Sequence, residues 1–377
     1  MRYFFVVGEP SGDLHASNLM RGILDNDSEA SFRFYGGDKM ASIAGPENLV
    51  KHYKKMSFFG VAEVIRNIRT ILSQIKQCQK AIMDFNPDVV VLVDYPSFNM
   101  EIARFAHNHG FTVYYYIAPK VWAWKEWRVK LIKKYVDRLY TIFPFETNYF
   151  RKKGIEAHFF GNPLQDAIHQ RLFPMKDTLE LRKELGVDNR PIIALLAGSR
   201  RTEIRRNLRN MLLLRKRFPN YQMVLTAVSW IPMEFYQNII KEEDIHIVVD
   251  KTYEVLSISQ AAIVTSGTAT LETALIGTPE VVVYHVSRIV EFMRPFVLKI
   301  PFISLVNINL GKECVKEIVT SRFNCNFVET QLRSILPGGE KREKMLADFE
   351  QLRQLIKEKG SSFRTAADMV ESLKKKS

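Results

Sequence analysis

The chain has 377 residues, of which 46% are apolar and 25% charged, with 18 glycines and 15 prolines. This composition is typical of a folded globular protein and excludes disorder, collagen and coiled coil as the main architecture. The 54 lysines and arginines exceed the 41 acidic residues by 13, which favours an anionic partner: nucleic acid, a phosphorylated small molecule or an acidic membrane surface.

The chain has three cysteines, and none of them stands at the spacing of a metal-ligand motif such as CxxC. An odd number of cysteines without such spacing argues against a disulfide framework or structural zinc, and it fits a reducing cytoplasm. The most apolar stretch, residues 292–310, is interrupted by Arg294, Pro295, Lys299 and Pro301. We therefore expect a cytoplasmic protein that does not span a membrane but can lie on one.

Short apolar runs alternate with helical patterns along the whole chain. The runs are Tyr3–Val7, Val89–Val93, Thr112–Tyr116, Leu139–Ile142 and His158–Phe160, then Ile192–Leu196, Gln222–Leu225, Ile245–Val249, Ala261–Val264 and Val281–Tyr284. Runs of this length are typical of parallel strands that are buried on both faces. The alternation predicts an α/β fold with two doubly wound, Rossmann-like domains.

The domain boundary is predicted from turn signals. Gly-Asn-Pro at 161–163 and Asn-Arg-Pro at 189–191 flank a helical pattern. We place the first domain at residues 1–165 and the second at 166–359, with a helix at about 360–377 that can pack back on the first. Two such domains face each other across a cleft, and their ligands bind at the carboxyl ends of the strands.

Two strand ends of the first domain carry residues suited to chemistry. Gly8 and Gly12 stand four apart after the first run, in a tight turn that can bring the backbone close to a ligand. An ordinary turn before a capped helix explains them equally well. Asp94 follows the run Val89–Val93. It can act as a general base, or it can cap a turn before Pro96.

Two strand ends of the second domain have the composition of phosphate-binding turns. Gly198 permits close approach, Ser199 can donate a hydrogen bond and Arg200 can bind phosphate bidentately. Residues 265–272 offer backbone N–H groups and hydroxyls at a helix start, where Glu272 can reach a ribose. Either turn alone fits an ordinary helix cap, but two in one domain favour a nucleotide.

Residues 58–80 form an amphipathic pattern with basic residues opposite the apolar ones. The apolar positions at helical spacing are Val61, Val64, Ile65, Ile68, Ile71, Leu72 and Ile75. The default interpretation is a helix packed on the sheet, and the alternative is a face for acyl chains or membrane. Trp122, Trp124 and Trp127 open a segment, 120–153, with ten basic and three acidic residues. This segment is either a loop with a solvated basic helix or a surface for nucleic acid or lipid.

Seven segments in order, through nearly the whole chain, resemble the bacterial lipid-A-disaccharide synthase family. They are GEPSGD at 8–13, VDYPSFN at 93–99, KVWAW at 120–124, FPFE at 143–146, GSR at 198–200, SGTATLE at 266–272 and SLVNINLG at 304–311. The resemblance implies a two-domain GT-B fold. It also implies an inverting glycosyltransferase that joins UDP-2,3-diacylglucosamine to 2,3-diacylglucosamine 1-phosphate through a β-1,6 linkage and releases UDP.

The resemblance also implies roles for individual residues. Asp94 matches the proposed catalytic carboxylate, and Glu9, Ser11 and Gly12 match a loop facing the acceptor or the cleft. The positions that match the UDP side are Gly198, Ser199, Arg200, Ser266, Gly267, Thr268, Glu272 and Asn307. This chain departs from common family residues at Pro10, Ala118, Lys120, Ala197 and Val306.

The predicted partners are the UDP-linked acylated sugar, the acylated sugar phosphate and, peripherally, the inner-membrane surface of a Gram-negative bacterium. We expect no metal, no cofactor and no nucleic acid. Two rival functions stay open. A UDP-sugar 2-epimerase of the same fold would not need the apolar 58–75 face or Trp122–Trp127. A nucleic-acid-binding protein would explain the charge but not two phosphate loops.

Overall fold

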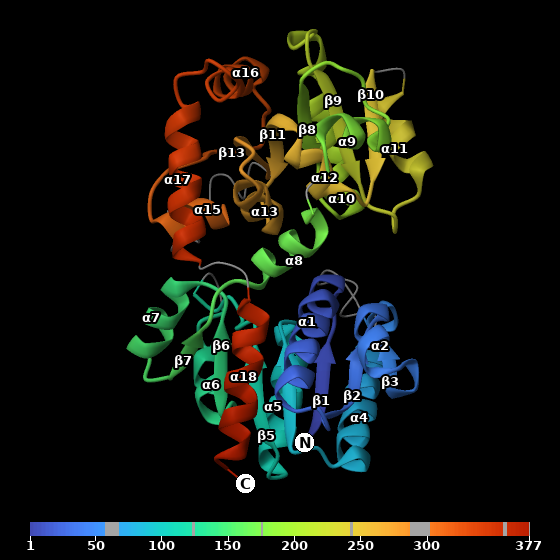
Figure 1. Cartoon of the computed structure of the whole chain (residues 1–377), viewed down its shortest axis with the longest axis vertical. Coiled ribbons are helices and arrows are strands. Elements are labelled where there is room, and N and C mark those ends of the chain that lie inside the picture. The colour runs from blue at the N-terminus through green and yellow to red at the C-terminus, as the bar shows by residue number, and fades with distance from the viewer. Residues whose placement is uncertain are drawn as a thin grey trace. The chain divides into compact units, whose positions relative to one another are not determined.

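The computed structural model describes residues 1–56, 68–122, 125–174, 176–241, 244–286, 302–356 and 360–376. The chain forms two compact units (Figure 1): unit 1 comprises Met1–Ala167 with Ile356–Ser377, and unit 2 comprises Ile168–Leu355. Each unit has its own parallel sheet with helices packed against it. The predicted α/β class with two doubly wound domains is therefore confirmed.

Unit 1 is built on a seven-stranded parallel sheet in the order β3-β2-β1-β4-β5-β6-β7. Its strands are β1 (Arg2–Val7), β2 (Ser31–Gly36), β3 (Leu49–His52), β4 (Val89–Val93), β5 (Thr112–Tyr116), β6 (Arg138–Thr141) and β7 (Ala157–Phe159). Its helices are α1 (Pro10–Asn26), α2 (Asp38–Ala44), α4 (Ile68–Phe85), α5 (Pro96–Asn108), α6 (Arg128–Tyr135), α7 (Pro144–Lys152) and α18 (Ser361–Lys374), and α8 (Pro163–Leu172) leads into unit 2. Short 3-10 turns lie at Pro46–Asn48 and Tyr53–Lys55.

Unit 2 has a six-stranded parallel sheet in the order β10-β9-β8-β11-β12-β13. Its strands are β8 (Ile192–Leu196), β9 (Gln222–Ala227), β10 (Ile245–Val249), β11 (Ser259–Thr265), β12 (Glu280–His285) and β13 (Lys316–Thr320). Its helices are α9 (Thr178–Leu185), α10 (Arg201–Leu212), α11 (Met233–Ile240), α12 (Thr252–Ser257), α13 (Thr268–Ile276), α15 (Leu305–Leu310), α16 (Cys325–Arg333) and α17 (Arg342–Leu355), with a 3-10 turn at Arg215–Arg217.

The central strands are buried on both faces, as their unbroken apolar runs predict. In β4, Val90 and Leu92 pack into one core cluster of unit 1, while Val91 and Val93 pack into the other. β8 of unit 2 is likewise buried along its whole length. Because side chains alternate across a strand, a strand covered on both faces must be apolar at every position.

The C-terminal helix α18 lies beside α1 in unit 1 (Figure 1). A Cβ at Gly22 would stand 2.9 Å from the Cβ of Ala366, so glycine lets the two helices approach closely. Arg138 donates to both carboxylate oxygens of Asp368 at 2.7 and 2.8 Å. The Asp166 carboxylate accepts hydrogen bonds from the backbone N–H groups of Gly360 and Ser362. These contacts join α18 to α1, to β6 and to α8.

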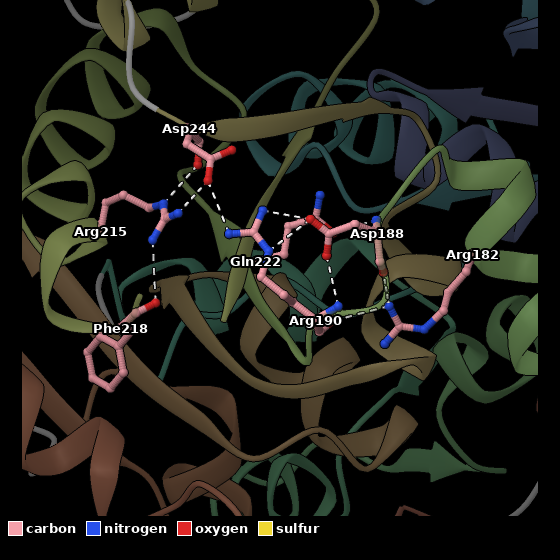
Figure 2. Close-up of polar contacts among 7 residues, drawn as sticks. All are labelled: Arg182, Asp188, Arg190, Arg215, Phe218, Gln222 and Asp244. Carbon is pink, nitrogen blue, oxygen red and sulfur yellow. Dashed lines mark hydrogen bonds and ion pairs between the residues drawn. The ribbon is translucent and has the colours of Figure 1, made fainter. Parts of the chain in front are cut away.

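Charged side chains join the amino ends of neighbouring strands in unit 2 (Figure 2). The guanidinium of Arg190 donates to Asp188 Oδ2 at 2.6 and 2.8 Å and to Asp244 Oδ2 at 3.1 Å. Arg215 also binds Asp244, and the backbone N–H of Asp188 donates to Gln222 Oε1 at 3.0 Å. The hydrogen bonds from Arg190 lower the pKa of Asp188, and those from Arg215 and Arg190 lower the pKa of Asp244. The cluster stabilises the sheet at the amino ends of its strands, which is the end opposite the predicted phosphate loops.

A buried histidine on α1 gives unit 1 a predictable pH dependence. His15 is 7% exposed, and its Nδ1 has no hydrogen-bond partner among the described residues. Burial lowers the pKa of the imidazole from 6.5 to about 4, although the nearby Asp166 carboxylate opposes the shift. Between these pH values the unfolded state binds more protons than the folded state. The free energy of unfolding should therefore fall as the pH falls from 6.5 toward 4.

We expect His15→Gln to remove this part of the pH dependence, because glutamine does not titrate. Relative to the parent, the variant should gain up to about 3 kcal/mol of unfolding free energy between pH 6.5 and pH 4. Urea unfolding at half-unit pH steps measures the difference. His109→Gln, at an exposed position on the same unit, is the control and should follow the parent. Parallel curves for the parent and His15→Gln would show that the pKa of His15 is the same in the folded and the unfolded state.

Candidate functional site

The strand order places a switch point in each unit. In unit 1 the direction of winding reverses between β1 and β4, and in unit 2 between β8 and β11. In doubly wound sheets, ligands bind outside the carboxyl ends of the strands at this point. The turns after β1 and β4 and the turns after β8 and β11 are the four turns singled out from the sequence. The topology therefore brings two of these turns, with the residues predicted in them, side by side in each unit.

The turn after β1 uses its two glycines for packing inside unit 1. A Cβ at Gly8 would lie 2.3 Å from Cγ of Tyr95, and a Cβ at Gly12 would lie 2.7 Å from Cγ1 of Val7. Glu9 is the extended N-cap of α1 and is partly exposed, and Ser11 is exposed in the first turn. The geometry thus explains both glycines without a ligand, while the side chains of Glu9 and Ser11 remain accessible.

Asp13, the last residue of this motif, caps a helix other than its own. Its carboxylate accepts hydrogen bonds from the backbone N–H groups of Gly37, Lys39 and Met40, at 2.8, 3.1 and 3.2 Å. These groups lie at the N-terminus of α2. Burial raises the pKa of Asp13, and the three N–H groups oppose the rise. Asp13 therefore connects the turn after β1 with the turn after β2.

Asp94 stands at the carboxyl end of β4 with an unusual backbone. Asp94 and Tyr95 have φ angles of 44° and 48°, in the left-handed region that non-glycine residues rarely adopt. The Asp94 carbonyl accepts hydrogen bonds from Asn99 Nδ2 and from the Tyr115 hydroxyl, each at 2.7 Å. This network fixes the backbone through the carbonyl and does not engage the carboxylate, and the residue as a whole is partly exposed. Backbone strain held in this way is a feature of functional sites.

The electrostatic surroundings of Asp94 suit a base. Burial raises the pKa of its carboxyl group, while the Lys120 ammonium and the Tyr95 N–H oppose that rise. A carboxylate with a raised pKa is a stronger base than an ordinary aspartate. Ile117, at the end of the neighbouring strand β5, has a φ angle of 62°. Strained residues therefore occur at the ends of two adjacent strands.

The turn after β8 has an exposed arginine. Gly198 has a φ angle of 109°, and a Cβ there would stand 3.0 Å from Glu203 Oε2, so glycine is required. Ser199 is exposed, and its carbonyl accepts from Trp230 Nε1 at 3.3 Å. The Arg200 side chain is 63% exposed and pairs with Glu203 at 3.2 Å. This geometry leaves the Arg200 guanidinium at the surface of the switch point.

The turn after β11 opens at the N-terminus of α13. Ser266 is partly exposed, and Gly267 and Thr268 are exposed. Gly267 is the N-cap residue, and no side chain caps the helix there. A Cβ at Gly267 would contact nothing within 4 Å, and its extended backbone does not require glycine. The uncapped N–H groups and the open space beside them suit an anion, since a helix N-terminus attracts negative charge.

Two predicted UDP residues have partners inside unit 2. Glu272 accepts a hydrogen bond from the Tyr253 hydroxyl at 2.7 Å, and burial raises the pKa of its carboxyl group. Asn307 is fully buried. Its Nδ2 donates to Val315 O and Glu317 Oε1, and its Oδ1 accepts from the N–H groups of Cys314 and Val315. All of its hydrogen-bonding capacity is therefore used within the protein, and this geometry supports a structural role rather than direct contact with UDP.

The predicted acyl or membrane face is described only in part. Val61, Val64, Ile65, the Ile68 side chain and Trp124 lie outside the described residues. On α4, Leu72 is 52% exposed and Ile71 is partly exposed. Trp122 is partly buried, and its Nε1 donates to Glu146 Oε1 at 2.9 Å. The indole is thus anchored to the protein at its polar edge.

The described residues contain no group of three or more His, Cys, Asp or Glu side chains that could hold a metal ion. In the same part of the chain, no helix combines the length and the apolar character needed to cross a bilayer.

Comparison with known proteins decides the family. The model of the lipid-A-disaccharide synthetase family matches residues 3–369. The chain belongs to this family. It is 34% identical to the lipid-A-disaccharide synthase of Geobacter sulfurreducens over 381 residues, which cover 99% of this chain and 98% of the relative. It is also 34% identical to the synthase of Myxococcus xanthus, with 99% and 97% of the two chains covered.

Solved structures confirm the architecture. The S. aureus MnaA–UDP co-structure superposes with a TM-score of 0.69 at 14% identity, over 99% of this chain and 97% of that one. The Neisseria meningitidis UDP-GlcNAc 2-epimerase bound to UDP-GlcNAc gives a TM-score of 0.62 at 14% identity and covers both chains completely. At such identities the likeness shows the GT-B fold alone. The lipid-A-disaccharide synthetase family instead makes the chain a disaccharide-forming glycosyltransferase of lipid A biosynthesis, as the resemblance predicts.

Proposed function

We propose that the chain transfers 2,3-diacylglucosamine from UDP to 2,3-diacylglucosamine 1-phosphate. The product is the β-1,6-linked disaccharide 1-phosphate, formed with inversion at the donor's anomeric carbon, and UDP is released. The structural observation that carries the proposal is Asp94, a strained, partly exposed residue whose carboxyl group has a raised pKa, at the switch point of unit 1. A sugar hydroxyl needs such a base, because it is a weak nucleophile near neutral pH.

In this proposal Asp94 removes the proton from the acceptor hydroxyl as the new bond forms. Its backbone anchors, Asn99 and the Tyr115 hydroxyl, hold the main chain and leave the carboxylate for the substrate. Glu9 and Ser11, on the neighbouring turn after β1, supply accessible polar groups for the acceptor. Preorganised groups of this kind lower the barrier without reorganising during the reaction.

The donor is proposed to bind at the switch point of unit 2. The Arg200 guanidinium and the N–H groups at the start of α13 offer positive charge for the diphosphate. The same groups stabilise the negative charge that develops on UDP as it leaves. Glu272 is the candidate for the ribose hydroxyls, and it would have to share its carboxylate with Tyr253.

A direct assay tests the reaction. The purified chain is incubated with UDP-2,3-diacylglucosamine and 2,3-diacylglucosamine 1-phosphate, and the products are identified by mass spectrometry. We expect UDP and the disaccharide 1-phosphate in equal amounts. UDP formed without disaccharide would indicate hydrolysis. An epimerised UDP-sugar formed without UDP would replace the transferase by an epimerase of the same fold.

Peripheral association with the inner membrane is proposed from α4. Leu72 is 52% exposed, and Arg69 and Lys76, three residues before and four after it, are exposed as well. Residues at these spacings share one helix face. An apolar side chain between two cations suits a membrane surface with anionic lipids, because apolar insertion and charge attraction add.

Leu72→Glu should weaken membrane binding without unfolding the chain, because the side chain is exposed. We expect the fraction that sediments with vesicles containing anionic phospholipid to fall several-fold, and added salt to lower it further for the parent. Leu179→Glu is the matched control, because Leu179 is a 65% exposed leucine on α9 of unit 2. Equal sedimentation of the parent and Leu72→Glu would remove α4 from the membrane proposal.

A further inference from the structure

A lysine beside Asp94 has no part in the function proposed so far. Lys120 is exposed in the segment after β5, which we name the Lys120 loop (residues 117–122). No described carboxylate pairs with its ammonium within 4 Å, although its charge opposes the rise in pKa that burial causes at both Asp94 and Glu146. The other cation nearby, Arg128, is buried and donates to Ser97 Oγ at 3.0 Å. Among the described residues, Lys120 is the cation whose charge acts on Asp94, and it is exposed to a ligand at this point.

The Lys120 loop starts next to Asp94. The Asp94 N–H donates to the carbonyl of Tyr116, the last residue of β5, at 3.2 Å. The next residue, Ile117, has a φ angle of 62°, which is strained for a β-branched side chain. The Ala118 N–H donates to Tyr140 O at 3.1 Å. These hydrogen bonds fix the direction in which the loop leaves the sheet. Lys120 follows four residues after Tyr116.

The far end of the Lys120 loop is anchored by Glu146. This residue is fully buried, and its Oε1 accepts from Trp122 Nε1 at 2.9 Å. Its Oε2 accepts from the N–H groups of Ile142 and Phe143, each at 3.2 Å. The indole also packs edge-to-face on Phe145 with 4.9 Å between ring centroids. One buried carboxylate therefore connects the turns after β5 and β6.

A loop fixed at both ends presents Lys120 at little entropic cost on binding. A lysine ammonium is a compact point charge that suits a phosphate group. The acceptor of the proposed reaction carries a phosphate on the same sugar whose hydroxyl must reach Asp94. A cation close to the base can therefore bind that phosphate while the hydroxyl lies at the carboxylate.

We propose that Lys120 binds the anomeric phosphate of the acceptor and selects a phosphorylated acceptor, and that Glu146 positions the Lys120 loop through Trp122. This inference rests on the proposed function and names the residue that distinguishes its acceptor from the unphosphorylated sugar. Burial raises the pKa of Glu146 to about 7, against the hydrogen bond from Trp122. The anchor is therefore strongest at alkaline pH, where the carboxylate is ionised.

The test compares two acceptors, with and without the phosphate, in the parent and in Lys120→Met. For the phosphorylated acceptor we expect kcat/KM to fall roughly 10- to 100-fold, as for a lost charge-assisted contact. For unphosphorylated 2,3-diacylglucosamine the parent and the variant should be equally poor. Lys130→Met, at an exposed position on α6, is the matched control and should keep the parent's preference.

Other outcomes separate the explanations. If both acceptors lose activity equally in Lys120→Met, and the acid limb of the pH profile moves, Lys120 acts on Asp94 and the phosphate site is wrong. An unchanged preference for phosphate overturns the inference while the transferase function stands. If the parent forms no disaccharide from the phosphorylated acceptor, the proposed function itself fails.

The positioning role of Glu146 has its own variants. Trp122→Phe retains the ring contact with Phe145 but removes the N–H donor to Glu146. Glu146→Gln replaces one accepting oxygen by an amide NH₂, which cannot accept a hydrogen bond from the N–H groups around it. Both should lower the preference for the phosphorylated acceptor, with a smaller effect than Lys120→Met, and leave UDP affinity unchanged. A folded Trp122→Phe variant with the parent's preference would show that Glu146 does not position Lys120.

Discussion

Asp94→Asn is expected to lower kcat at least about a hundredfold while UDP affinity changes little, since general-base catalysis contributes roughly 10²–10⁴-fold. Asparagine tolerates the left-handed backbone about as well as aspartate, so the φ angle of 44° at this position need not change. The anchors from Asn99 and Tyr115 bind the main-chain carbonyl and are retained. The variant therefore removes basicity with little change of shape, and the loss should fall on the chemical step.

The pH profile adds a second readout for Asp94. Because burial raises the pKa of the carboxyl group, the parent should lose activity as the pH falls through that raised value. The residual activity of Asp94→Asn should lack this acid limb. Asp84→Asn, at an exposed position on α4, controls for the loss of one negative charge and should behave as the parent. A folded Asp94→Asn enzyme with near-normal kcat would eliminate Asp94 as the base, and Glu9 on the neighbouring turn would be tested next.

The central strands could be predicted because burial on both faces produces apolar runs. β4 and β8 are such strands, and all the predicted runs fall on observed strands. β2, β3 and β13 are absent from the prediction. In β2, exposed and buried positions alternate at the start, and β3 and β13 lie at the edges of their sheets. Their polar residues conceal them, because a strand that is buried on one face need not be apolar throughout.

The turns of the candidate site could be found from the sequence, but not what each residue in them does. Gly8 and Gly12 follow a strand and so mark a turn, yet the neighbours that require glycine are Tyr95 and Val7. Tyr95 is distant in the sequence, and no local pattern indicates that contact. Asn307 is similar, because its four hydrogen bonds depend on a loop that returns from residues 314–317.

Glu146 is the clearest case of a residue whose role the sequence did not indicate. Its sequence signal is ordinary: proline opens a helix at Pro144, and a glutamate follows at the third helical position, where it caps the backbone of Phe143. That pattern predicts a helix start, and the segment FPFE at 143–146 adds to the family resemblance, but neither assigns Glu146 a role. The bond to Trp122 comes from the neighbouring turn. Only the order of β5 and β6 in the sheet brings the two residues together.

Arg200→Ala is expected to weaken UDP binding roughly 10- to 100-fold, because a charge-assisted hydrogen bond to phosphate contributes about 1.5–3 kcal/mol. The side chain is 63% exposed and pairs at 3.2 Å with Glu203, which lies against Gly198. Its loss should not disturb the fold of unit 2. The turnover number should fall as well, since the guanidinium also stabilises the charge on the leaving diphosphate. Titration calorimetry with UDP and steady-state kinetics measure the two effects separately.

Two further variants identify what Arg200 supplies. Arg200→Lys keeps the charge but loses the planar fork, so an intermediate loss of affinity would indicate bidentate binding of phosphate. Arg209→Ala removes an exposed arginine further along α10 and should leave UDP affinity unchanged, which separates a direct contact from the general positive charge of the helix.

If Arg200→Ala binds UDP and turns over as the parent does, the diphosphate does not lie at the turn after β8. The uncapped N-terminus of α13, where Gly267 leaves open space, would then be the remaining anion site of unit 2, and Gly267→Val would be the variant that tests it.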